Sequence, residues 1–179
     1  MSRLEMGRAL PSTSFAGLCF LATVLLQGFH ELEHVVQVLQ RFVLHNPKGA
    51  GILGTWLDIE PVHIVYNGGF LLLIGLCFWA GGYLHRSRTS IALWLMAFAL
   101  LFEGYHFVEH TFKIAQFIDT GRNGTPGILG HFFNLVWLHF TYNTVAYAPL
   151  LFVFFADGHH RKAARAVPGL FRQTRRAAL

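Results

Sequence analysis

Two short segments place histidine and glutamate at the same spacing within long apolar stretches. "HELEH" occupies residues 30–34 and "HFVEH" occupies residues 106–110, so both follow the pattern H-x-x-E-H. Residues three and four apart lie on one face of a helix, and each segment therefore presents two imidazoles and one carboxylate together. Ionisable groups are costly in apolar helices, so this pattern predicts a functional site, and metal binding suits both side chains.

The first segment also contains the zinc-protease pattern H-E-x-x-H through Glu31, and the second segment decides between the two patterns. Phe107 occupies the position equivalent to Glu31, whereas Glu33 corresponds to Glu109. We therefore interpret Glu33 and Glu109 as the shared pair and the protease pattern as an accidental match. Two equal copies predict two metal ions or one shared cluster, and not the single zinc of a protease.

The two segments belong to an internal repeat with a shift of 76 residues and no gap. Residues 25–67 align with 101–143, and thirteen of these 43 positions are identical. The identical polar pairs are His30/His106, Glu33/Glu109, His34/His110, Gln40/Gln116, His63/His139, Tyr66/Tyr142 and Asn67/Asn143. Buried His, Glu and Asn are expensive in membrane helices, so a shared function explains their presence in both copies better than polar packing alone.

Four apolar stretches, residues 14–43, 53–82, 89–118 and 130–156, are long enough to cross a bilayer, which takes about 20 residues. The expected fold is an all-α integral membrane domain over residues 1–179, with repeats at 14–82 and 89–156 and a basic tail at 157–179. Each repeat is a helical hairpin that crosses and returns. The two hairpins therefore run parallel and should be related by a pseudo-two-fold axis along the membrane normal.

The hairpin geometry predicts where the polar side chains meet. His34 and His63 lie at equal distances from the first turn, and His110 and His139 lie at equal distances from the third turn. With a rise of about 1.5 Å per residue, all four helices then offer imidazole at one depth. The predicted metal ligands are His30, Glu33, His34, His63, His106, Glu109, His110 and His139.

Roles follow from this arrangement. Glu33 and Glu109 are expected to bridge the metals and to be the catalytic carboxylates. The residues expected to orient the imidazoles by hydrogen bonds are Tyr66, Asn67, Tyr142 and Asn143. His131, whose counterpart is Thr55, is expected to mark a substrate-facing side.

This ligand set predicts a dinuclear centre with iron as the first expectation, because bridging carboxylates favour iron or manganese over copper. The expected function is a membrane oxidoreductase of the oxygenase, hydroxylase or desaturase type that acts on a lipophilic small molecule from the bilayer. Zinc, copper and manganese stay open as the metal. Three other functions stay open: a haem b electron-transfer protein, a membrane zinc hydrolase, and an accessory or metal-handling subunit that works with other membrane subunits or an electron donor.

The composition agrees with a multi-pass membrane protein. Hydrophobic residues make up 54% of the chain and charged residues 13%, against about a quarter charged in soluble domains. Ten of the 14 Lys and Arg residues lie on the side of the two termini, so both termini are expected in the cytoplasm. The basic tail is interpreted as this topology signal, and no nucleic-acid partner is expected.

Overall fold

The structure, a computed structural model, describes residues 13–57 and 60–177, and the described residues contain helices and no strands. Helix α1 (Thr13–Val38) continues into the π-helical turn η1 (Leu39–Val43). The other elements are α2 (Gly54–Leu57), α3 (Glu60–Ala80), the 3-10 turn η2 (Tyr83–His85), α4 (Ile91–Thr120), the 3-10 turn η3 (Leu129–His131), α5 (Leu135–Ala156) and α6 (His159–Ala177). Four of them, α1 with η1, α3, α4 and α5, are long and apolar enough to cross a membrane.

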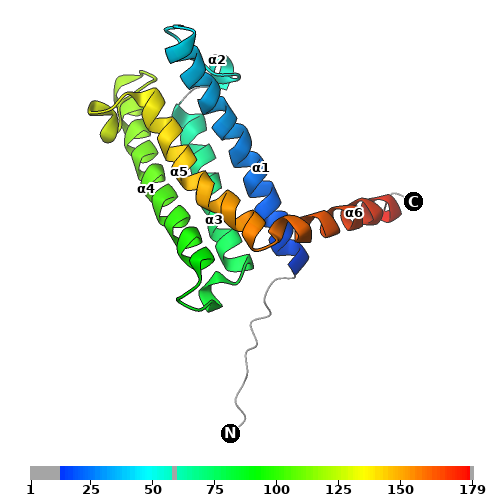
Figure 1. The fold of residues 1–179 in the computed structure, drawn as a ribbon. Coiled ribbons are helices and arrows are strands. Elements are labelled where there is room, and N and C mark those ends of the chain that lie inside the picture. Colours follow the sequence, from blue (N-terminus) through cyan, green and yellow to red (C-terminus); the bar gives the residue numbers. More distant parts are fainter. Residues whose placement is uncertain (1–12, 58–59, 178–179) are drawn as a thin grey trace.

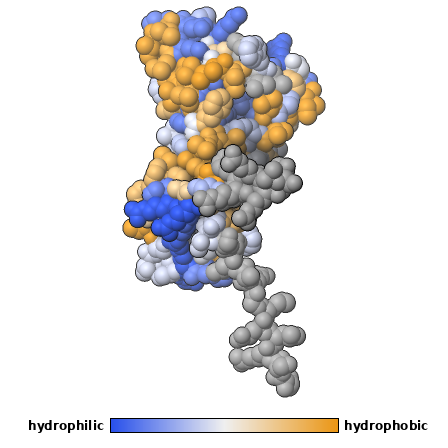
Figure 2. Space-filling model, turned by 90° about the vertical axis from the view of Figure 1, so that its right-hand side faces the viewer, coloured by the Kyte–Doolittle hydropathy of each residue, from blue (hydrophilic) through white to orange (hydrophobic). Residues whose placement is uncertain are grey.

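The four long helices form one bundle (Figure 1). Helix α1 packs on α3 and α5, and α4 packs on the same two helices, so the repeat partners α1 and α4 lie at opposite corners. The space-filling view shows apolar side chains over much of one face, with hydrophilic ones gathered towards its two ends (Figure 2). The pseudo-two-fold axis along a membrane normal stays a prediction.

The apolar core fills the half of the bundle near the N-terminus of α1. Phe20, Phe70, Ile74, Met96 and Leu150 are fully buried there and belong to one packed cluster. Close van der Waals packing of such side chains holds apolar helices together even where the surroundings are lipid. The other half of the bundle holds the repeated polar residues, so the core provides a rigid base for them.

The second and fourth predicted spans begin too early. The expected starts were residues 53 and 130, whereas α3 begins at Glu60 and α5 at Leu135. In the "GILG" segments, residues 51–53 and 127–128 lie in turns, while Gly54 begins α2 and Leu129 begins η3. The side chain of a glutamate in the preceding long helix accepts from backbone N–H groups of each segment. Asn134 then caps α5 by accepting from the backbone N–H groups of Val136 and Trp137.

The tail forms a helix that sequence analysis did not predict. Helix α6 leaves the bundle sideways and crosses α1 near its start (Figure 1). The contact is close, since a Cβ on Gly17 would lie 2.6 Å from the backbone N of Ala163. His159 stacks on Phe20 with ring centroids 3.9 Å apart, which fixes the beginning of α6 on the core.

Candidate metal centre

Six imidazoles from all four long helices meet in the polar half of the bundle. Within the repeats, the ring centroids of His30 and His63 are 6.3 Å apart, and those of His106 and His139 are also 6.3 Å apart. Between the repeats, the distances are 6.1 Å for His34 and His139 and 5.7 Å for His63 and His110. The six repeated histidines therefore form one cluster, which we call the histidine cluster.

Each repeat contains a close imidazole pair with the same geometry. The Nε2 atoms of His30 and His34 are 3.1 Å apart, and those of His106 and His110 are 3.2 Å apart. Two imidazole nitrogens bound to one metal at about 2.1 Å would lie about 3.0 Å apart in octahedral and about 3.4 Å apart in tetrahedral geometry. Both pairs have the spacing of two ligands on one ion.

Hydrogen bonds determine which ring nitrogen carries the proton in three of the six histidines. The Nδ1 of His139 lies 2.7 Å from the carbonyl oxygen of Leu135, and a carbonyl can only accept. His34 Nδ1 lies 2.9 Å from Oε1 of Gln37, and His106 Nδ1 lies 3.2 Å from Oε2 of Glu103. With the proton on Nδ1, each neutral ring keeps its Nε2 lone pair for the cluster, as metal-bound histidines do.

Glu33 and Glu109 each hold the turn that follows their helix. Oε1 of Glu33 accepts from the backbone N–H groups of Leu53 and Gly54 at 2.9 and 3.1 Å. Oε1 of Glu109 accepts from Ile128 and Leu129 at 2.7 and 2.9 Å. The second oxygen, Oε2, is buried in both residues and has no hydrogen-bond partner in the described part of the chain.

The two repeated glutamines also hold the loops that follow the long helices, as the glutamates do. Gln40 exchanges two hydrogen bonds with the backbone of Gly51, and Gln116 does the same with Gly127. These bonds close both loops onto their long helices. The glutamines and the glutamates therefore hold the same two loops against α1 and α4.

The predicted supporting residues lie around the cluster, in more varied roles than expected. Tyr66 stacks on His30 with centroids 4.1 Å apart, and Tyr142 lies 4.8 Å from His106. The Nδ2 groups of Asn67 and Asn143 donate to the backbone carbonyls of His63 and His139, so these bonds hold the helix and not the imidazole ring. His131 is exposed in η3.

The two halves differ in three buried polar groups that the repeat did not identify. Lys113 Nζ lies 3.1 Å from Oε1 of Glu60, and both side chains are almost completely buried. Their counterparts in the other repeat are Gln37 and Val136, which carry no charge. Glu103 bonds to His106, whereas its counterpart Gln27 donates to Asn143 at 2.7 Å. The signal that could have found these three residues is the lack of a charged counterpart in the other repeat.

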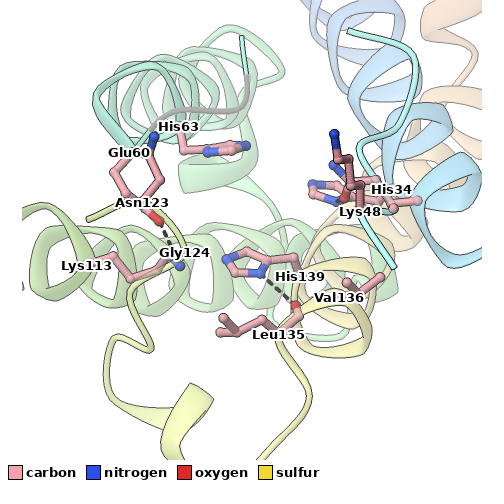
Figure 3. Close-up of a pocket in the computed structure, with 12 residues that line it drawn as sticks. His34, Lys48, Glu60, His63, Lys113, Asn123, Gly124, Leu135, Val136 and His139 are labelled. Carbon is pink, nitrogen blue, oxygen red and sulfur yellow. Dashed lines mark hydrogen bonds and ion pairs between the residues drawn. The ribbon is translucent and has the colours of Figure 1, made fainter. Parts of the chain in front are cut away.

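A polar cavity of about 160 Å³ reaches the histidine cluster from the end of the bundle formed by the loops. His34, His63 and His139 point into it from three different helices (Figure 3). Lys48, Glu60, Lys113 and Asn123 line the rest. Water and small polar molecules can therefore approach three of the six imidazoles from this side.

Across residues 13–57 and 60–177, no group of three or more His, Cys, Asp or Glu side chains is already arranged to hold a metal ion. What the structure contains is two pairs at ligand spacing with four further candidates around them. The role of these residues as metal ligands stays a prediction. No family model, curated protein or solved structure matches the chain.

Proposed function

We propose that the protein is a membrane-embedded metalloprotein that binds two metal ions at the histidine cluster, with iron as the expected metal. The observation that carries the proposal is the duplicated Nε2–Nε2 approach in His30/His34 and His106/His110. In each pair of histidines one Nε2 has a free lone pair, because the proton of His34 and of His106 is on Nδ1. A cation that replaces the proton between the two Nε2 atoms would be bound by the lone pairs of both rings at once.

The remaining ligands would come from side chains that already surround these pairs. His63 and His139 lie between the two pairs, and the Nε2 of His139 faces the cluster for the reason given above. The unpartnered Oε2 atoms of Glu33 and Glu109 give the second reason for a cation, because a buried carboxylate oxygen without a donor is costly.

The arrangement favours metal ions over haem. A bis-histidine haem needs its two imidazoles on opposite faces of a flat macrocycle, whereas the closest imidazoles here have their nitrogens 3.1 and 3.2 Å apart. The cavities that reach the cluster have volumes of about 160 and 290 Å³, below the usual range of about 300–1,000 Å³ for ligand pockets. The haem alternative is therefore an outcome to test and not the proposal.

We further propose that the centre serves an oxidoreductase acting on a lipophilic molecule, within a bundle that spans the membrane with both termini in the cytoplasm. A bound pair of redox metals would supply electron transfer to an oxidant. The chain's own residues would do the rest. Glu103, Gln37 and the carbonyl of Leu135 keep three imidazoles in one tautomer, and the apolar core excludes water from the cytoplasmic side.

The test is metal analysis of the detergent-purified protein by mass spectrometry, together with its absorption spectrum. We expect about two iron ions per chain, as in di-iron bundle proteins. His30→Ala and His106→Ala should each lower this content by about half, since each removes one ligand of one pair. His131→Ala is the matched control, because His131 is exposed and its loss should leave the metal content unchanged.

Other results would overturn parts of the proposal in distinct ways. A Soret band would replace it with the haem alternative. Two zinc ions would keep the site and remove the redox function. Protein without bound metal after growth in metal-supplemented medium and purification without chelators would leave the histidines as structural residues.

A further inference from the structure

A second cavity, of about 290 Å³, opens between α1 and α3 and reaches the other side of the histidine cluster. Its outer part is lined by Leu26, Phe29 and Val62, which are 40%, 49% and 36% exposed. Its inner end is lined by His30, Glu33, Gln37 and His63. The outer part therefore faces what would be bilayer hydrocarbon, while the inner end touches the predicted metal ligands.

The same place in the other repeat holds three aromatic rings in contact. Phe102 and Tyr105, the counterparts of Leu26 and Phe29, pack against Tyr142 with centroids 5.9 and 6.1 Å apart. In the first repeat Tyr66 instead stacks flat on His30 and donates to the carbonyl of Leu26. The replacement of a leucine by a phenylalanine and the different tyrosine contact give the two repeats different packing beside the cluster.

The lining also restricts the polar end of any ligand. No Lys or Arg is among the described residues that line this cavity, and its inner end holds the carboxylate of Glu33. The polar cavity of Figure 3, by contrast, contains Lys48 and Lys113. An anionic head group would meet the carboxylate of Glu33 and no Lys or Arg among the described lining residues, so a neutral polar end fits better.

We propose that the gap between α1 and α3 is the entrance for the lipophilic substrate, an uncharged molecule with one hydrocarbon chain and a neutral polar end. This rests on the proposed function, because the polar end would be placed at His30 and His63. The volume suits part of one chain, with the remainder in the bilayer. His63 and Gln37 line both cavities, so the lipophilic molecule and a small polar reactant meet there from opposite sides.

The experiment uses photocrosslinking of the full chain in liposomes with two diazirine-bearing probes, a farnesol analogue and a palmitic acid analogue. The proposal expects the farnesol probe to label residues of α1 and α3 around Leu26 and Val62. Val62→Trp and Leu26→Trp fill the cavity from either wall and should reduce this labelling at least several-fold. The matched controls are Val65→Trp and Leu25→Trp, which are 75% and 64% exposed at neighbouring positions.

Metal content is measured in the same samples, so that the two proposals can fail separately. Lost labelling with retained metal in both cavity variants supports the entrance. Unchanged labelling in both, or labelling that falls equally in the controls, overturns it and leaves the metal centre intact. Stronger labelling by the palmitate probe overturns the neutral polar end. Specific labelling of a protein that contains no metal keeps the cavity as a binding site and removes the proposed function.

Discussion

At the scale of single residues, Glu33 and Glu109 combine a structural role with an unfilled one. Oε1 of each is held by two backbone N–H groups of the following loop. Oε2 of each is buried and has no partner among the residues that the structure describes. A residue used only to hold the loop would not need a charged carboxylate. A variant that keeps one acceptor oxygen but removes the charge can therefore separate the loop role from the metal role.

The first prediction concerns Glu33→Gln compared with Glu33→Ala. The amide oxygen of glutamine can still accept from the loop, so Glu33→Gln should keep the thermal stability within about 1 kcal/mol of the wild type. It should nevertheless lower the metal content, because a neutral amide is a poor metal ligand. Glu33→Ala should lower both, and Glu109 should behave in the same way. Full metal content in both glutamine variants would limit the carboxylates to the loops.

The residues of the cluster could be found from sequence because the repeat singles out identical polar positions. The hydrogen-bond partners of these residues were much harder to predict from sequence. Glu33 and Asn67 bond to the backbone, and a backbone N–H or C=O has no residue identity that a sequence pattern could reveal. The ion pair of Glu60 and Lys113 was missed for a different reason, since neither charge recurs in the other repeat.

At the scale of elements, the Glu60–Lys113 pair joins α3 to α4 at the edge of the polar cavity. Lys113 Nζ also donates to the carbonyl of Thr125 at 2.6 Å, and the Thr125 hydroxyl donates to the carbonyl of Lys113 at 3.0 Å. The pair therefore ties the loop after α4 to both helices. In the first repeat, Gln37 occupies the position of Lys113 and lines the same cavity.

The second prediction uses this difference between the repeats. Lys113→Gln or Glu60→Val alone should lower the free energy of unfolding by about 3–5 kcal/mol, since each leaves one charge buried without its partner. The double variant, which copies the residues of the opposite repeat, should recover most of that loss. Thermal unfolding in detergent gives the double-mutant cycle. Additive losses in the double variant would mean that the two side chains act independently.

The junction of α6 with the bundle contains a histidine, outside the spanning helices, whose pKa is lowered by burial. Burial against Phe20, and then the nearby Lys162, lower the pKa of His159 to about 4. Its Nε2 lies 3.1 Å from the hydroxyl of Tyr83, which donates to Asp157 at 2.8 Å, and Arg86 pairs with the same carboxylate at 2.6 Å. The neutral ring is therefore the form that fits the folded junction.

The third prediction is a loss of stability in acid at this junction. His159 has its ordinary pKa of about 6.5 when unfolded and the lowered value when folded, so protons favour the unfolded state. Stability should be complete above pH 6.5 and fall by about 2–3 kcal/mol as the pH drops towards 4. His159→Asn should remove this part of the pH dependence. Protease cleavage within α6, compared between the two proteins, is the measurement, and equal pH profiles would contradict the assignment.

The long helices were predictable and their ends were less so. Apolar length and the turn residues gave α1 and α4 to within two residues, apart from the π-helical turn at Leu39–Val43. The late starts of α3 and α5 depend on loop hydrogen bonds to Glu33 and Glu109 from about 20 residues earlier. Helix α6 was missed because its basic residues were interpreted only as a topology signal, although Ala163 and Gly17 give it a packing face.

At the scale of the whole molecule, the two long loops lie at the end of the bundle opposite α6 (Figure 1). The polar cavity lies at this end, because Lys48 and Asn123 of these loops line it. The structure strengthens the charge asymmetry between the two ends. Lys113 was counted with the loop end, yet it is buried and paired with Glu60. That leaves Arg41, Lys48 and Arg122 at the loop end, while Arg86, Arg88 and the basic residues of α6 lie at the other end of the described chain. Lys and Arg near membrane helices favour the cytoplasm, so the loop end should face away from it.

The last prediction tests this orientation with single cysteines. The two native cysteines, Cys19 and Cys77, are buried and should react slowly, whereas Asn123 and Arg165 are exposed at opposite ends. A membrane-impermeant maleimide should label Asn123→Cys in intact cells and Arg165→Cys only after permeabilisation. The reverse pattern would place the polar cavity on the cytoplasmic side. A small polar reactant would then reach His34, His63 and His139 from the cytoplasm, while the entrance between α1 and α3 would still open to the bilayer.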